Sequence, residues 1–126
     1  MRPRRSRGAA IVDFVLVMAV LIPVFLGILQ VALVMLVRNT LAAAASEGAR
    51  YAATLDREPV DGAARTRAQI EGALAARFAQ DVDARSTLVD GAAGIEVIVH
   101  AEVPALGIGG PAVELTVSGH AVEESR

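Results

Sequence analysis

Histidine is the residue here with the widest chemical use, because imidazole binds metals and exchanges protons near neutral pH. The two histidines, His100 and His120, each fall on the polar side of a segment whose apolar residues alternate. The chain has no cysteine, and no third ligand converges on the pair, so the donor set for a metal is incomplete. We therefore expect no metal site and no cysteine nucleophile.

Other catalytic patterns are missing from the sequence as well. The glycines at positions 107, 109 and 110 precede an apolar strand instead of opening a helix, so they do not form a phosphate-binding loop. No nucleophile-elbow motif occurs. These observations predict a protein that is not an enzyme, with no cofactor and no small-molecule substrate.

Asp13 is an acid that stands at the start of a long apolar run. Phe14 to Val37 contains no charged residue, and as a helix this run would cover about 36 Å. A bilayer has a hydrocarbon core of roughly 30 Å, in which a carboxylate costs about 2.5–3.5 kcal/mol at the centre and less near the boundary. From the residues alone, Asp13 either pairs with Arg5 or Arg7 at the interface or waits for a cation inside the bilayer.

The apolar run itself is best interpreted as a membrane span. The core helix of a soluble protein would carry a polar stripe, and this run has none. A cleaved secretory signal could end at the small residues 42–45, but its apolar region should be about 7–15 residues long. Four arginines precede the run and only Arg38 follows it closely, which predicts a cytoplasmic N-terminus. Residues 38–126 would lie outside, and their 8 arginines against 13 acids argue against nucleic acid as a partner.

Small residues follow one face of the span. Ala19, Pro23 and Gly27 recur at four-residue intervals, with Gln30 close to their stripe. Small residues allow helices to approach closely, and a glutamine can hydrogen-bond across helices. Because Pro23 removes a backbone hydrogen bond, it should also bend the helix. The pattern favours a span that packs against protein.

Beyond the span, residues 38–56 continue the helical pattern as a stem rich in alanine. Three small residues share one face suited to tight packing: Ala45, Gly48 and Ala52. Glu47 and Arg50 are three residues apart and can form a solvated ion pair, which would stabilise the helix by about 0.2–0.5 kcal/mol.

A second, amphipathic helix is expected over about residues 62–80. Pro59 and Gly62 interrupt the first helix, and Asp61 is placed to cap the second one. Its apolar stripe consists of Ala63, Ile70, Leu74 and Phe78, extended by Val82. We favour packing of this stripe on the body over a membrane-surface helix, because the polar face carries charges of both signs.

The last third of the chain changes to the period of β-strands. Residues 95–103 and 113–121 alternate between apolar and polar positions, which predicts two half-buried antiparallel strands joined by the turn-rich segment 104–111. Pairing of Val103 with Val113 would bring these residues opposite one another: His120 and Glu96, and His100 and Thr116. A weaker pattern indicates a strand at Ser86–Val89 before a turn at Asp90-Gly91.

The N-terminal residues resemble a known family. Residues 7–14, Arg-Gly-Ala-Ala-Ile-Val-Asp-Phe, resemble the signature of type IV pilins and, more closely, of TadE-like proteins: a basic leader, a glycine, four mostly apolar residues, an acid and a long apolar helix. TadE-like proteins add a proline midway along the span and a Glu-Gly-Ala-Arg motif beyond it. The matching residues here are Gly8, Asp13, Pro23, Glu47, Gly48, Ala49 and Arg50.

The resemblance implies a minor pilin-like component of a tight-adherence (Flp-type) pilus system. It implies that a membrane prepilin peptidase cleaves the chain between Gly8 and Ala9 on the cytoplasmic side. Asp13 would then pair with the free amine of an adjacent subunit, although an aspartate reaches less far than the glutamate usual in the family. The implied partners are the peptidase, other pilin-like subunits and the secretion components of the system.

The expected architecture is α+β, with a basic leader at 1–8, a transmembrane helix at 9–37, a stem at 38–56 and a small extracytoplasmic domain at 57–126. That domain should hold a helix and an antiparallel β-hairpin or short sheet. The expected function is pilus assembly at the bacterial inner membrane through helix packing, without catalysis. One alternative is a membrane-anchored accessory or binding protein that is never processed. A secreted protein released after residue 45 is another.

Overall fold

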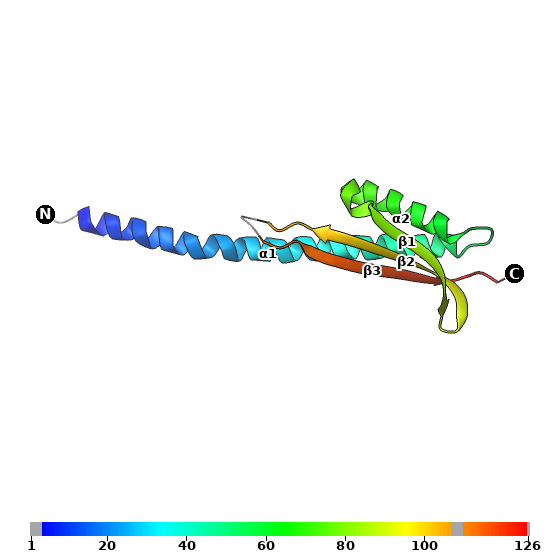
Figure 1. The fold of residues 1–126 in the computed structure, drawn as a ribbon. Helices are drawn as coiled ribbons and strands as arrows, with labels where there is room; N and C mark the ends of the chain where they lie inside the picture. The colour runs from blue at the N-terminus through cyan, green and yellow to red at the C-terminus, as the bar shows by residue number, and fades with distance from the viewer. Residues whose placement is uncertain (1–3, 107–109, 126) are drawn as a thin grey trace.

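One helix forms the axis of the molecule. The computed structural model describes residues 4–106 and 110–125, and in it α1 runs from Arg4 to Ala52. Its 49 residues correspond to about 73 Å at 1.5 Å per residue. The N-terminal half extends alone, and the C-terminal half lies against the rest of the chain (Figure 1). The prediction of a long N-terminal helix that continues past the apolar run is confirmed. Arg2 and the glycines at 107 and 109 lie outside the described residues.

The second helix, α2, runs from Pro59 to Ala73 and folds back along α1. It begins earlier than expected because Pro59 occupies the first turn, where its fixed φ suits a helix. Asp61 was wrongly expected to be the cap. The N-cap is Glu58, whose backbone N–H donates to the Asp61 carboxylate at 2.8 Å from within the first turn.

The second helix also ends sooner than the expected residue 80. Leu74 adopts an extended backbone at the C-cap, and a short 3-10 helix, η1, follows at Ala76–Ala79. This break brings Phe78 into the core. Val82 is buried too, but it lies in the first strand and not on the helical stripe.

Three antiparallel strands form the sheet, in the order β1-β2-β3. β1 spans Asp81–Val89, β2 spans Ala92–Val103 and β3 spans Val113–Val122. β1 is longer than the expected Ser86–Val89. Asp90 and Gly91 connect it to β2 with φ values of 50° and 85°, the left-handed pair that suits a two-residue hairpin turn.

The predicted register of the second hairpin is confirmed. Val103 pairs with Val113, and the polar pairs follow from it: Glu96 with His120, and His100 with Thr116. The odd-numbered residues of β2 and β3 face inward, where Val97, Val99 and Val117 are buried.

The inner face of the sheet packs on the C-terminal half of α1 and on α2 (Figure 1). The largest fully buried side chains are Val37, Leu41, Thr66, Ile70, Ile95, Val97, Val99 and Val103. Val37 and Leu41 belong to α1, so residues 37–53 share one core with residues 57–126. The segment expected to be a stem is therefore the central helix of the domain.

Candidate functional site

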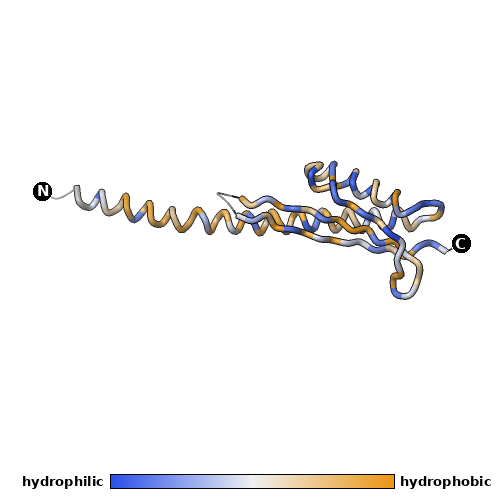
Figure 2. Tube along the Cα trace, in the orientation of Figure 1, coloured by the Kyte–Doolittle hydropathy of each residue, from blue (hydrophilic) through white to orange (hydrophobic). Residues whose placement is uncertain are grey.

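The N-terminal half of α1 presents bare apolar surface. Most large apolar side chains from Ile11 to Leu29 are 41–65% exposed, whereas Met18 and Leu26 are half-buried. This half of the helix is strongly hydrophobic in Figure 2. Within the described part of the chain, α1 is the one helix long and apolar enough to cross a membrane. Such a helix near the N-terminus suggests a single-pass membrane protein.

The residues that carry the pilin-like signature lie at the start of this helix. Gly8, Ala9 and Asp13 are exposed, and a Cβ built at Gly8 would have nothing within 4 Å. Asp13 stands about 7.5 Å along the axis from Gly8. It forms no ion pair with any other side chain that the structure describes. Cleavage after Gly8 and pairing of Asp13 with a neighbouring amine stay predictions.

The residues of the small-residue stripe in the span have different surroundings. Ala19, Pro23 and Gly27 are exposed, and α1 continues through Pro23 without interruption. Gln30 is half-buried and bonds within its own chain: its Nε2 donates to the Pro104 carbonyl at 3.3 Å, and its Oε1 accepts from Leu106 N–H at 2.7 Å. Packing of the three exposed residues against another subunit stays a prediction.

The small face of residues 45–52 packs within the chain. Ala45, Gly48 and Ala52 are buried against the domain. A Cβ at Gly48 would collide with the Thr66 hydroxyl and lie 2.7 Å from the Gly62 carbonyl oxygen, so glycine lets α2 approach α1. Thr66 was not singled out from the sequence, although its hydroxyl is fully buried and donates to the Gly62 carbonyl at 2.9 Å.

The Glu-Gly-Ala-Arg motif divides between core and solvent. Gly48 and Ala49 are buried, while Glu47 and Arg50 form the expected ion pair, at 3.5 Å between Oε2 and Nη2. The Arg50 side chain is 69% exposed, and exposed pairs of this kind contribute little to stability. Gly48 and Ala49 are therefore the residues of the motif that contribute most to the packing of the domain.

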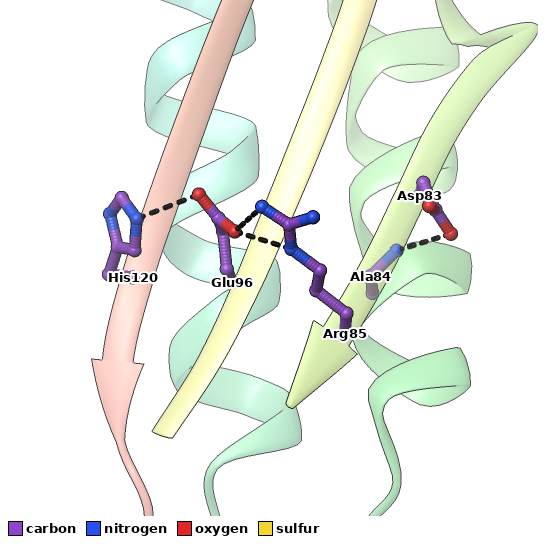
Figure 3. A network of polar contacts seen from close by, with 5 residues as sticks. All are labelled: Asp83, Ala84, Arg85, Glu96 and His120. Atoms are coloured by element: carbon purple, nitrogen blue, oxygen red, sulfur yellow. Dashed lines mark hydrogen bonds and ion pairs between the residues drawn. The ribbon is translucent and has the colours of Figure 1, made fainter. Parts of the chain in front are cut away.

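The outer face of the sheet carries a charged network across all three strands (Figure 3). Glu96 of β2 accepts from Arg85 Nε at 2.7 Å through Oε2, and its Oε1 lies 3.0 Å from His120 Nε2. The hydrogen bond from Arg85 holds the pKa of Glu96 below its usual range, against the opposing effect of burial. Arg85 was missed from the sequence because the register of β1 could not be read from its weak alternation.

Two side chains bond to backbone groups near the start of the edge strand β1. Arg67 of α2 donates to the Val82 carbonyl at 2.7 Å. The Asp83 carboxylate accepts from Ala84 N–H at 2.9 Å (Figure 3). These contacts satisfy backbone groups that would otherwise attract another strand.

A shallow depression of about 600 Å³ lies where β1 begins. Its polar lining includes Arg77, Asp81, His100, Glu102, Glu114 and Thr116. His100 Nδ1 lies 2.9 Å from Thr116 Oγ1, so this histidine is already engaged on the sheet. In the described ranges, no group of three histidine, aspartate or glutamate side chains is arranged to hold a metal ion.

Comparison with known protein families finds a match in the N-terminal part of the chain. Residues 8–50 match the family model described as TadE-like protein. That match contains the glycine junction, the exposed apolar helix and the packing motif. No curated protein matches the chain, and no solved structure does.

Proposed function

The chain is TadE-like over residues 8–50, and we propose that it is a non-catalytic minor pilin or assembly component of a tight-adherence (Flp-type) pilus. The family suggests a component associated with such a pilus. The observation that supports a structural role is the division of α1. One half is bare and apolar, and the other is the central helix of a folded domain.

The proposed topology places the arginine-rich leader in the cytoplasm and the domain outside the bacterial inner membrane. Support comes from the arginine asymmetry, since Arg7 and the basic residues before it precede the apolar half of α1. A prepilin peptidase would remove residues 1–8 there. The chain would then act through lateral contacts of α1 with other pilin-like subunits and with secretion components.

Asp13 is proposed to set the axial position of the helix between subunits. Two apolar helices in lipid gain little hydrophobic energy from meeting, so packing and polar contacts decide how they align. A carboxylate near the cytoplasmic boundary that pairs with the amine of Ala9 in a neighbour supplies such a contact. Its exposure and its lack of a described partner are compatible with this role.

The test is complementation of a strain that lacks the gene. Wild type and Asp13→Glu, which restores the acid usual in the family, should both return surface pili. Asp13→Ala should insert in the membrane fraction in equal amount and yet fail to return them. Pili that are unchanged when the gene is deleted would reject the proposed function. Pili restored by Asp13→Ala would reject the pairing role alone.

A second candidate function is a membrane-anchored binding protein that is never processed. The depression at the start of β1 favours it, because its charged lining could hold a polar ligand. The two functions differ at the N-terminus: the binding protein would retain residues 1–8 in mature membranes, and the pilin-like component would not.

A further inference from the structure

Gln30 ties the loop between β2 and β3 to the apolar half of α1. Its side-chain amide meets the Pro104 carbonyl and Leu106 N–H, residues 74 and 76 positions away in the sequence. The described flanks of the loop, Pro104–Leu106 and Gly110–Ala112, therefore lie beside α1 near the level of Gln30, and they reach further toward the N-terminus than the strands and α2 (Figure 1).

The exposure of α1 changes near this level. Residues 8–29 cover about 33 Å, which matches the roughly 30 Å of a hydrocarbon core. On the face toward the domain, Leu33 and Val34 are half-buried and Val37 is buried. Away from the domain, the side chains that stay more than half exposed are Val31, Met35 and Leu36.

The exposed apolar surface of α1 thus continues beyond Gln30 toward the C-terminus of the helix. The first charge after the run is Arg38, about 12 Å along the axis from Gln30. No polar spacer separates the span from the domain. If the hydrocarbon core covers residues 8–29 of α1, its outer boundary falls at the level of the described flanks of the loop.

The loop has the chemistry of such a boundary. No charged residue occurs from Pro104 to Ala112, and Leu106 is 41% exposed. Irregular backbone is tolerated near lipid only where its polar groups are satisfied. Gln30 satisfies the Pro104 carbonyl and Leu106 N–H, and these contacts use both ends of its own amide.

We propose that the described flanks of this loop, Pro104–Leu106 and Gly110–Ala112, rest in the outer headgroup region of the bilayer that α1 spans. The occupant of this surface is phospholipid. The domain thereby has two membrane contacts, one through α1 and one through the loop, and these fix its depth and its tilt. The proposal rests on the membrane insertion of α1 in the proposed function.

Single-tryptophan reporters test this contact, because the chain has no tryptophan. Three full-length variants are reconstituted in phosphatidylcholine vesicles: Leu106→Trp in the loop, Leu88→Trp at the far end of the sheet and Val20→Trp in the span. Leu88 is 73% exposed in β1 and serves as the matched control outside the membrane. Emission is measured with acyl chains brominated at a shallow or a deep position, and with aqueous iodide.

We expect Leu106→Trp to lose emission to the shallow bromine, to be shielded from iodide and to emit at shorter wavelength than Leu88→Trp. Leu88→Trp should be quenched by iodide alone, and Val20→Trp most strongly by the deep bromine.

If Val20→Trp is quenched by bromine but Leu106→Trp behaves like Leu88→Trp, the proposed contact of the loop with lipid is rejected, whereas the membrane insertion of α1 is supported. Shielding of Leu106→Trp from both quenchers would mean that protein covers the loop, which also rejects lipid. If bromine leaves Val20→Trp unquenched, the insertion of α1 itself fails.

Discussion

Gly48 of α1 and Gly62 of α2 lie so close that a Cβ on either residue would be 2.7 Å from the carbonyl oxygen of the other. This reciprocal contact makes the first helix and the second a tightly packed antiparallel pair. It also explains why small residues occupy these positions, since Thr66 and Ala52 fill the space on either side.

Enlarging Gly48 should therefore destabilise the domain. Gly48→Ala places a methyl group against backbone and the Thr66 hydroxyl, and overpacking of this kind costs about 1–3 kcal/mol. Thermal unfolding of the full chain in detergent, followed by circular dichroism, measures the change.

Gly72 provides the matched control on α2. A Cβ there would meet nothing within 4 Å, so Gly72→Ala should be neutral or stabilise the fold by about 0.4–1 kcal/mol. Equal melting temperatures for Gly48→Ala and the wild type would contradict the close packing of α1 on α2.

The hairpin register could be predicted from the sequence, whereas the partner of the small face could not. Alternation along β2 and β3 excludes registers that turn the inward valines toward solvent, and the pairing of Val103 with Val113 across the connecting segment is among those that remain and is the one observed. A helix face made of Ala45, Gly48 and Ala52 predicts close packing. It does not show which element packs there, because small side chains allow many different elements to approach. The partner of Gln30 could not be predicted either: its side-chain amide bonds to the loop between β2 and β3 and not to a second helix.

The outer sheet network should make stability depend on pH. Because the pKa of Glu96 is lowered in the folded state, its contribution is present above the ordinary glutamate pKa of about 4.3 and is lost as the pH falls through the lower folded value. Glu96→Gln should therefore melt below the wild type at neutral pH, and the difference should shrink on acidification.

Glu71→Gln, an exposed substitution on α2, is the control for that series. Its melting temperature should follow that of the wild type at each pH. A difference between Glu96→Gln and the wild type that stays constant down to strongly acidic pH would contradict a network held by the ionised carboxylate.

The contact between Gln30 and the loop should be visible in hydrogen exchange. Gln30→Met keeps the length of the side chain but removes the acceptor of Leu106 N–H, so exchange of that amide should accelerate. Amides in the middle of β2 should exchange at the wild-type rate. Unchanged protection of Leu106 in the variant would show that another group holds the loop.

The N-terminus of the mature chain tests the pilin-like assignment most directly. Intact-mass spectrometry of the protein extracted from membranes of cells with an active prepilin peptidase should find a chain that begins at Ala9. Gly8→Leu should retain residues 1–8, while Gly27→Leu, at an exposed glycine far from the junction, should be cleaved like the wild type. A wild-type chain that still carries residues 1–8 in those cells would contradict the account.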